Sequence, residues 1–147
     1  MKKIVQKPLG ELLIESKMIT IIHLEEALKV QKEKGGLVGQ ILVNLGYTTE
    51  EAIAQALTTQ YGLPYLPLSG YEIDFEVAKI IPEELARKFG LIAVDKVGSI
   101  LTVAMSNPLN VKATEEVETL TSLKVQIFVS TLTDVNEAIS KSYKAPV

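Results

Sequence analysis

Apolar residues recur at helical spacing in the N-terminal part of the chain, and the same pattern occurs there twice. Segment 9–31 can be laid over segment 38–60 so that leucine falls on leucine and glycine on glycine. The identical pairs are Gly10/Gly39, Leu13/Leu42, Thr20/Thr49, Ala27/Ala56, Leu28/Leu57 and Gln31/Gln60. An internal repeat fixes the architecture of the segment that carries it, so we expect two copies of one structural unit.

Each copy predicts a short helix followed by a longer one. The longer helices are expected to begin at Thr20 and Thr49, because threonine caps free N–H groups, with Thr48 as an alternative start. Gly35 and Gly62 are expected to end them. One face of each long helix follows the spacing i, i+3, i+4, i+7. These faces consist of Leu24, Ala27, Leu28 and Gln31 in the first copy and of Ile53, Ala56, Leu57 and Gln60 in the second.

The pattern changes after Gly62 and predicts a mixture of strands and helices. After a proline-rich connection, residues 75–90 predict a helix in two pieces, and residues 91–97 and 99–105 predict the two strands of a hairpin. Residues 106–122 predict a loop and a helix, residues 123–130 a strand, and residues 133–143 a final helix. We therefore predict an α+β fold, in which a tandem helical-hairpin repeat precedes a small α/β sandwich with about three strands. The expected subdomains are residues 1–62 and residues 63–147.

Composition narrows the classes of protein that fit this pattern. The 147 residues are 47% apolar with a net charge of −3, which favours a globular chain and gives no reason to bind DNA. No cysteine is present for disulfides or thiolate metal sites. The start lacks the apolar core of a signal peptide, and no apolar run reaches the roughly 18 residues of a membrane span. We expect a cytoplasmic protein without a direct membrane span.

Residue types that support catalysis are scarce. The single histidine, His23, cannot form a metal cluster, and we expect it to be an exposed helix residue. The glycine-rich stretch 35–40 lacks the Lys-Ser/Thr pair of a P-loop. Acidic residues occur as adjacent pairs such as Glu50/Glu51, and neighbours on a helix point in different directions. We therefore expect no enzymatic activity and no metal site.

The recurring glycine and glutamine allow two interpretations. Gly10 and Gly39 fall in the first turn of a predicted helix, where glycine is a poor helix former. Each can serve a close helix–helix crossing, or it can let a ligand lie against the backbone. Gln31 and Gln60 can be the solvated border of a helix, or they can hydrogen-bond a ligand held between the repeats.

The lysines near the end of the first copy allow two interpretations in the same way. Lys29, Lys32 and Lys34 cluster beside the glycine-rich stretch. Such lysines can attract an anion, and they can also complement the dipole at a helix C-terminus without any ligand.

The repeat resembles the N-terminal, MshEN-type domain of the assembly ATPases of type II secretion and type IV pilus systems. That domain carries two motifs of the form R-L-G-x-x-L followed by L-x-x-x-L-x-x-Q, separated by a short spacer. The spacer here is residues 32–36. The matching positions are Leu9, Gly10, Leu13, Leu24, Leu28 and Gln31 in the first copy and Val38, Gly39, Leu42, Ile53, Leu57 and Gln60 in the second. Segments 61–74, 80–94 and 101–110 also read like the family, so the resemblance covers almost the whole chain.

The resemblance implies a ligand, the second messenger cyclic di-GMP, with one motif on each half of the dinucleotide. In this interpretation the twelve motif positions are the ligand-binding residues, and Gly10 and Gly39 together cradle the ligand. The glycines let the backbone approach it, the leucines pack on the purines, and the glutamines hydrogen-bond a base or phosphate edge. Lys32 and Lys34 are expected to add charge near the phosphates. No cofactor other than this ligand is implied.

The chain departs from the family motif at both arginine positions, which are occupied by Pro8 and Leu37. An arginine fork can hold guanine O6 and N7 together, and each such contact is worth roughly 1–3 kcal/mol. The ATPase body of the family is also absent from these 147 residues. The resemblance therefore implies a non-catalytic, cyclic-di-GMP-binding regulatory module of a motor ATPase. The alternative is a protein-interaction module that docks the motor to its inner-membrane platform, with ligand binding weak or lost. The expected protein partners are the platform protein or the ATPase body.

Overall fold

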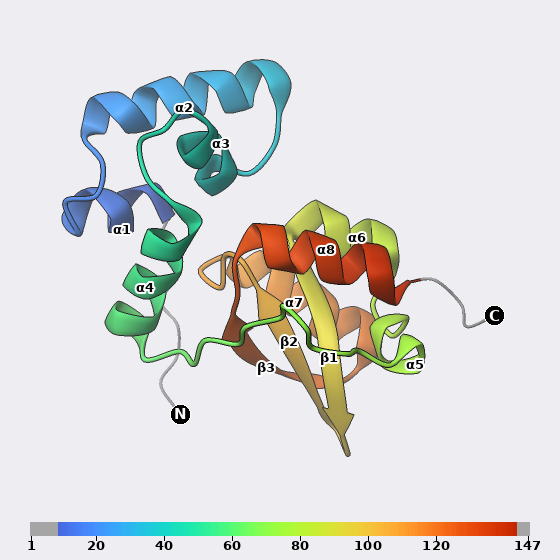
Figure 1. The fold of residues 1–147 in the computed structure, drawn as a ribbon. Helices are drawn as coiled ribbons and strands as arrows, with labels where there is room; N and C mark the ends of the chain where they lie inside the picture. The colour runs from blue at the N-terminus through green and yellow to red at the C-terminus, as the bar shows by residue number, and fades with distance from the viewer. Residues whose placement is uncertain (1–8, 144–147) are drawn as a thin grey trace.

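The computed structural model describes residues 9–143, and the helical repeat occupies the first part of this range. The repeat consists of α1 (Leu9–Glu15), α2 (Ile21–Lys34), α3 (Val38–Asn44) and α4 (Glu50–Tyr61). This confirms a short and a long helix in each copy. Figure 1 shows the four helices gathered at one end of the molecule.

The long helices begin and end at the residues that the sequence indicates. Thr20 and Thr49 are the N-caps, and their hydroxyl oxygens accept from the backbone N–H of His23 and Ala52. The start at Thr49 rules out the alternative at Thr48. Gly35 is the C-cap of α2, and Gly62 closes α4 in the left-handed conformation that glycine adopts without steric cost.

The equivalent glycines have different surroundings. Gly10 is buried, and a Cβ added to it would lie 2.5 Å from Cδ1 of Leu24 on α2. A Cβ on Gly39 would lie 3.1 Å from Cδ2 of Leu9 and 3.7 Å from Cδ1 of Ile53. Gly10 therefore lies close to Leu24 of the long helix in its own copy, whereas the nearest neighbour of Gly39 is Leu9 of the other short helix. This favours the helix-packing interpretation for Gly10.

The second part of the chain folds as an α+β unit, as predicted. Its elements are α5 (Phe75–Ala78), α6 (Glu83–Phe89), β1 (Leu91–Val97), β2 (Ile100–Met105), α7 (Val111–Thr121), β3 (Lys124–Val129) and α8 (Leu132–Ser142). Gly90 ends α6, and Gly98 turns the hairpin with a φ of 59°. The sheet order is β1-β2-β3, antiparallel between β1 and β2 and parallel between β2 and β3.

The sheet is covered on both faces at the start of β1. Residues 91–94 are all buried, although successive side chains of a strand point to opposite faces. Figure 1 shows α6 and α8 in front of the strands and α7 behind them. The core of this unit is a cluster that includes Ile81, Leu91, Leu101, Met105 and Ile139, each fully buried.

The core of the helical repeat receives two residues from the α+β unit. Its cluster includes Leu13, Leu42 and Leu57, together with Leu109 and Val129 from beyond residue 62. The expected division at residue 62 stays a prediction, because the apolar contacts cross it. Within residues 9–143 no helix combines the length and the apolar content needed to cross a membrane.

The two glycines provide a matched test of the packing. We expect Gly10→Ala to lower the free energy of unfolding by about 1–3 kcal/mol, because the added methyl overlaps Leu24 and overpacking strains a core. Gly39→Ala should change it by less than about 0.5 kcal/mol, because only the end of the Leu9 side chain must shift and alanine favours the helix. Chemical denaturation of both variants measures the difference, and equal losses would contradict the packing role assigned to Gly10.

Candidate ligand-binding site

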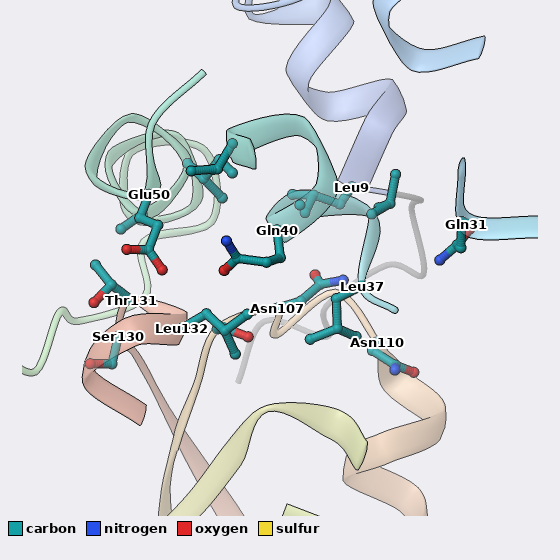
Figure 2. Close-up of a pocket in the computed structure, with 16 residues that line it drawn as sticks. Leu9, Gln31, Leu37, Gln40, Glu50, Asn107, Asn110, Ser130, Thr131 and Leu132 are labelled. Carbon is teal, nitrogen blue, oxygen red and sulfur yellow. The ribbon is translucent and has the colours of Figure 1, made fainter. Parts of the chain in front are cut away.

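A pocket of about 190 Å³ lies where the helical repeat meets the α+β unit. The repeat contributes α3, the start of α4 and residues near the ends of α1 and α2, whereas the α+β unit contributes residues 106–110 and 130–132. Figure 2 shows these segments facing one another around the pocket. Residues 106–110 follow β2 and residues 130–132 follow β3, so the pocket lies at the carboxyl ends of two parallel strands. Ligands of open α/β sheets bind at this edge.

The lining combines an apolar wall with neutral polar groups. The apolar wall includes Leu9, Leu37, Val38, Val43, Ile53 and Leu132. The amide side chains are those of Gln31, Gln40, Asn107 and Asn110, and the hydroxyl groups are those of Ser106, Ser130 and Thr131. Within the described residues 9–143 the lining includes one carboxylate, that of Glu50, and no Lys, Arg or His. An apolar pocket with a few polar groups is the usual form of a small-molecule site.

Hydrogen bonds hold the amide side chains in place. Gln31 Nε2 donates to the carbonyl oxygen of Gly36 at 2.9 Å, and Gln40 Nε2 donates to Asn44 Oδ1 at 2.7 Å. Asn107 Oδ1 and Asn110 Oδ1 accept from backbone N–H groups of the loop and of α7. Each amide thereby keeps its other end for a ligand.

Ser130 is a buried polar residue of this region whose side chain has no hydrogen-bond partner among residues 9–143. Its side chain is 1% exposed, and its Oγ makes no hydrogen bond to any described residue. A buried hydroxyl without a partner costs about 1–3 kcal/mol. A polar group bound in the pocket or an ordered water would remove that cost.

Glu50 ties the two parts of the molecule together at the rim of the pocket. It belongs to α4, and its two carboxylate oxygens accept from the backbone N–H and the hydroxyl group of Thr133 on α8, at 2.8 and 2.7 Å. The carboxylate thus adds to the N-cap of α8, where negative charge is favourable. Figure 2 shows the Gln40 side chain directed toward Glu50 across the pocket.

The structure brings five of the expected ligand-binding residues to this pocket. They are Leu9, Gln31, Val38, Gly39 and Ile53. Leu13, Leu42 and Leu57 are instead fully buried in the repeat core, and Leu24 covers the buried Gly10. The expectation that both glycines cradle a ligand stays a prediction. Gly39 lines this pocket and Gly10 does not. The cause is that the two copies have different neighbours: Leu24 fills the space over Gly10, whereas the α+β unit faces Gly39.

The remaining expected positions lie away from the pocket. Leu28 is 46% exposed on α2 and Gln60 is exposed near the end of α4. Lys32 and Lys34 lie in the last turn of α2 and do not line the pocket. Of the two arginine positions of the motif, Leu37 lines the pocket, whereas Pro8 lies outside the described residues.

Sequence reasoning missed the half of the lining that comes from the α+β unit. A signal was present, because polar residues lie at the ends of two predicted strands: Ser106 and Asn107 follow the strand at 99–105, and Ser130 and Thr131 end and follow the strand at 123–130. Gln40 and Glu50 were also missed, since single polar residues in the first turn of a helix are common.

His23 has a structural role outside the pocket. Its Nδ1 accepts from the backbone N–H of Thr20, which completes a capping box at the start of α2. Its ring stacks on Tyr47 at a centroid distance of 3.9 Å. The Tyr47 hydroxyl group donates to Glu26, and this hydrogen bond is the main reason that the pKa of Tyr47 is raised. Among residues 9–143 no cluster of His, Asp and Glu is suited to hold a metal.

Comparison with known proteins decides the family. The MshEN domain family matches residues 61–147, more than half of the chain. The chain belongs to the MshEN family. The matched residues include the α+β unit, with the pocket-lining residues that follow β2 and those that follow β3. The tandem motif lies before residue 61 and is outside the match. The resemblance inferred from the sequence is thereby confirmed.

Two curated relatives are type IV pilus assembly ATPases. This MshEN chain is 31% identical over 135 residues to PilB of Myxococcus xanthus and 34% identical over 139 residues to PilB of Thermus thermophilus. The alignments cover 92% and 93% of this chain, but only 24% and 16% of the two ATPases.

Two solved structures share the fold of this MshEN chain. The structure of MshE with cdg superposes with a TM-score of 0.67 at 28% identity, over 93% of this chain and 99% of the other. The N-terminal domain of XpsE superposes with a TM-score of 0.72 at 17% identity, over 98% and 99% of the two chains. The latter identity supports the fold alone. The predicted α+β fold with its helical repeat is confirmed.

Substitutions at Thr133 test whether its hydrogen bonds to Glu50 stabilise the contact between the helical repeat and the α+β unit. We expect Thr133→Val to lower the free energy of unfolding by about 0.5–1.5 kcal/mol, because it removes one of the two donors to the carboxylate. Thr133→Ser keeps the hydroxyl group and is the matched control, expected within about 0.5 kcal/mol of the wild type. Urea denaturation measures both variants, and equal stability of the valine variant and the wild type would show that this tie contributes nothing.

Proposed function

We propose that this chain is a non-catalytic regulatory module of a type IV pilus or type II secretion motor ATPase, and that it binds cyclic di-GMP in the pocket beside α3. The observation that carries the proposal is the fold shared with MshE with cdg, over almost the whole of both chains. The pilus ATPases among the relatives support the association with a motor. In this role the protein acts in the cytoplasm.

The size of the pocket suits one part of the ligand. Pockets that enclose a whole small molecule measure roughly 300–1,000 Å³, whereas this one measures about 190 Å³. One purine base would enter, with its faces against the apolar wall and its edges near the amides. Gly39 is half-buried in this wall, where the missing Cβ leaves room for the ring.

The charge of the lining indicates which part of the ligand enters. In the part of the lining that the structure describes, a phosphate would meet the carboxylate of Glu50 and no cation, which is unfavourable because burying a charge requires a compensating partner. The uncharged base therefore occupies the pocket, and the phosphates stay toward solvent. This orientation does not depend on Lys32 or Lys34.

Titration with cyclic di-GMP tests the proposal. We expect measurable heat and a rise in melting temperature at about 100 μM ligand, because a ligand that binds only the folded state stabilises it. Absence of both signals with a folded protein would remove the proposal.

A substitution at Gly39 tests whether cyclic di-GMP binds in this pocket. Gly39→Val should reduce the affinity for cyclic di-GMP by at least about tenfold, because the branched side chain occupies the space beside Leu9 and Ile53. Leu120→Ala is the control, since Leu120 is 56% exposed at the end of α7 remote from the pocket. Calorimetry measures both, and undiminished binding by the valine variant would place the ligand elsewhere.

A second candidate function is protein docking, and exposed apolar residues favour it. Ile21 and Ile22 at the start of α2 are 63% and 70% exposed, and Val97 at the hairpin is 69% exposed. These positions would contact the platform protein or the ATPase body in an assembled motor. A pull-down with the cytoplasmic domain of the platform protein, comparing the wild type with Ile22→Lys, tests this function. Equal capture of both proteins would contradict docking through α2.

A further inference from the structure

The pocket lacks the groups that distinguish guanine from adenine. On its N7 edge guanine presents two acceptors, O6 and N7, whereas adenine presents one acceptor and one donor. An arginine fork supplies two donors and therefore selects guanine. At residue 37 the chain has leucine, whose side chain lines the pocket, and among residues 9–143 no cation belongs to the lining.

Glu50 does not select guanine either, although guanine has a second edge, with N1–H and N2–H, that a carboxylate could bind. A free carboxylate can accept from guanine N1–H and N2–H together, an arrangement that adenine cannot match. In this structure both oxygens of Glu50 already accept from Thr133, at 2.8 and 2.7 Å. A paired contact with guanine would require this tie between α4 and α8 to break.

The amides can satisfy either base. Each amide offers donors at one end and an acceptor at the other. Gln31 and Gln40 use the donor end in the protein and keep an acceptor, whereas Asn107 and Asn110 use the acceptor end and keep donors. The lining therefore presents both kinds of group to an entering base, and Ser130 adds a buried hydroxyl group that can donate or accept.

We propose that this site tolerates either purine, so that cyclic di-AMP binds with an affinity close to that for cyclic di-GMP. The inference rests on the proposed function, since it concerns the same pocket and the same class of ligand. Leu37 is the specificity-determining residue. Its apolar side chain offers a base no hydrogen-bond donor, whereas an arginine at this position would offer the two donors that favour guanine.

Calorimetric titration of the 147-residue chain with the two dinucleotides tests the inference. They share the same sugar–phosphate ring, so the ratio of their dissociation constants reports on the bases. We expect the two constants to agree within about threefold, a difference of less than 1 kcal/mol. Binding of cyclic di-GMP more than about tenfold more tightly would overturn the inference and leave the proposed function intact. Failure of both ligands to bind the folded protein would overturn the proposed function itself.

Two variants at residue 37 separate the arginine fork from its charge. Leu37→Arg should shift the ratio toward cyclic di-GMP by about tenfold or more, as one bidentate pair is worth roughly 1–3 kcal/mol of discrimination. Leu37→Lys places a single ammonium group there, which can also donate to guanine O6 and N7 but without the rigid fork, so it should shift the ratio in the same direction by less. A folded arginine variant with an unchanged ratio would contradict the role of residue 37.

Melting curves establish that each variant is folded before it is titrated. This control matters because Leu37 packs near Gly90, where a Cβ would lie 3.3 Å from Leu37 Cδ1. The comparison of the two ligands on the wild-type chain needs no substitution and stands if both variants fail to fold.

Discussion

Val129 connects the sheet, the core of the helical repeat and the segment between them, and the position of the pocket depends on these contacts. It is the last residue of β3, and its side chain is fully buried in the core of the helical repeat. Its backbone N–H donates to Pro64, and its carbonyl oxygen accepts from Leu66, so the connection between the two parts lies along the sheet edge. Burial of an aliphatic side chain of this size stabilises by about 1.5–3 kcal/mol. Because Ser130 follows directly, the strand end is held against α3 and α4.

The pocket is therefore a product of the junction rather than of either part alone. The repeat supplies one wall and the residues after β2 and β3 supply the other. Glu50 and Thr133 add a polar tie at the rim, and a ligand between the two walls would contact both. Since a ligand can shift a conformational equilibrium only through differential contacts, a site at a junction is well placed to change how the two parts are arranged.

Local structure could be predicted from the sequence to within a residue or two. Thr20 and Thr49 cap helices, and Gly62 and Gly90 end them, because these residues act on backbone groups within a few positions of themselves. The presence of about three strands followed from the apolar patterns, whereas the parallel pairing of β2 with β3 came only from the structure. The site was harder to predict from the sequence, because no local rule connects Gln40 with Asn107, which belong to different parts of the fold.

The sequence by itself determined the duplicated helical unit, the order of helices and strands, and the absence of arginine at residue 37. Only the tertiary structure decided that the two copies differ. Gly10 and Gly39 occupy the same place in the repeat, yet Leu24 covers the first and the second lines a pocket. The reason is that a repeat prescribes equal neighbours within each copy, whereas the α+β unit packs against only one of them and breaks the symmetry.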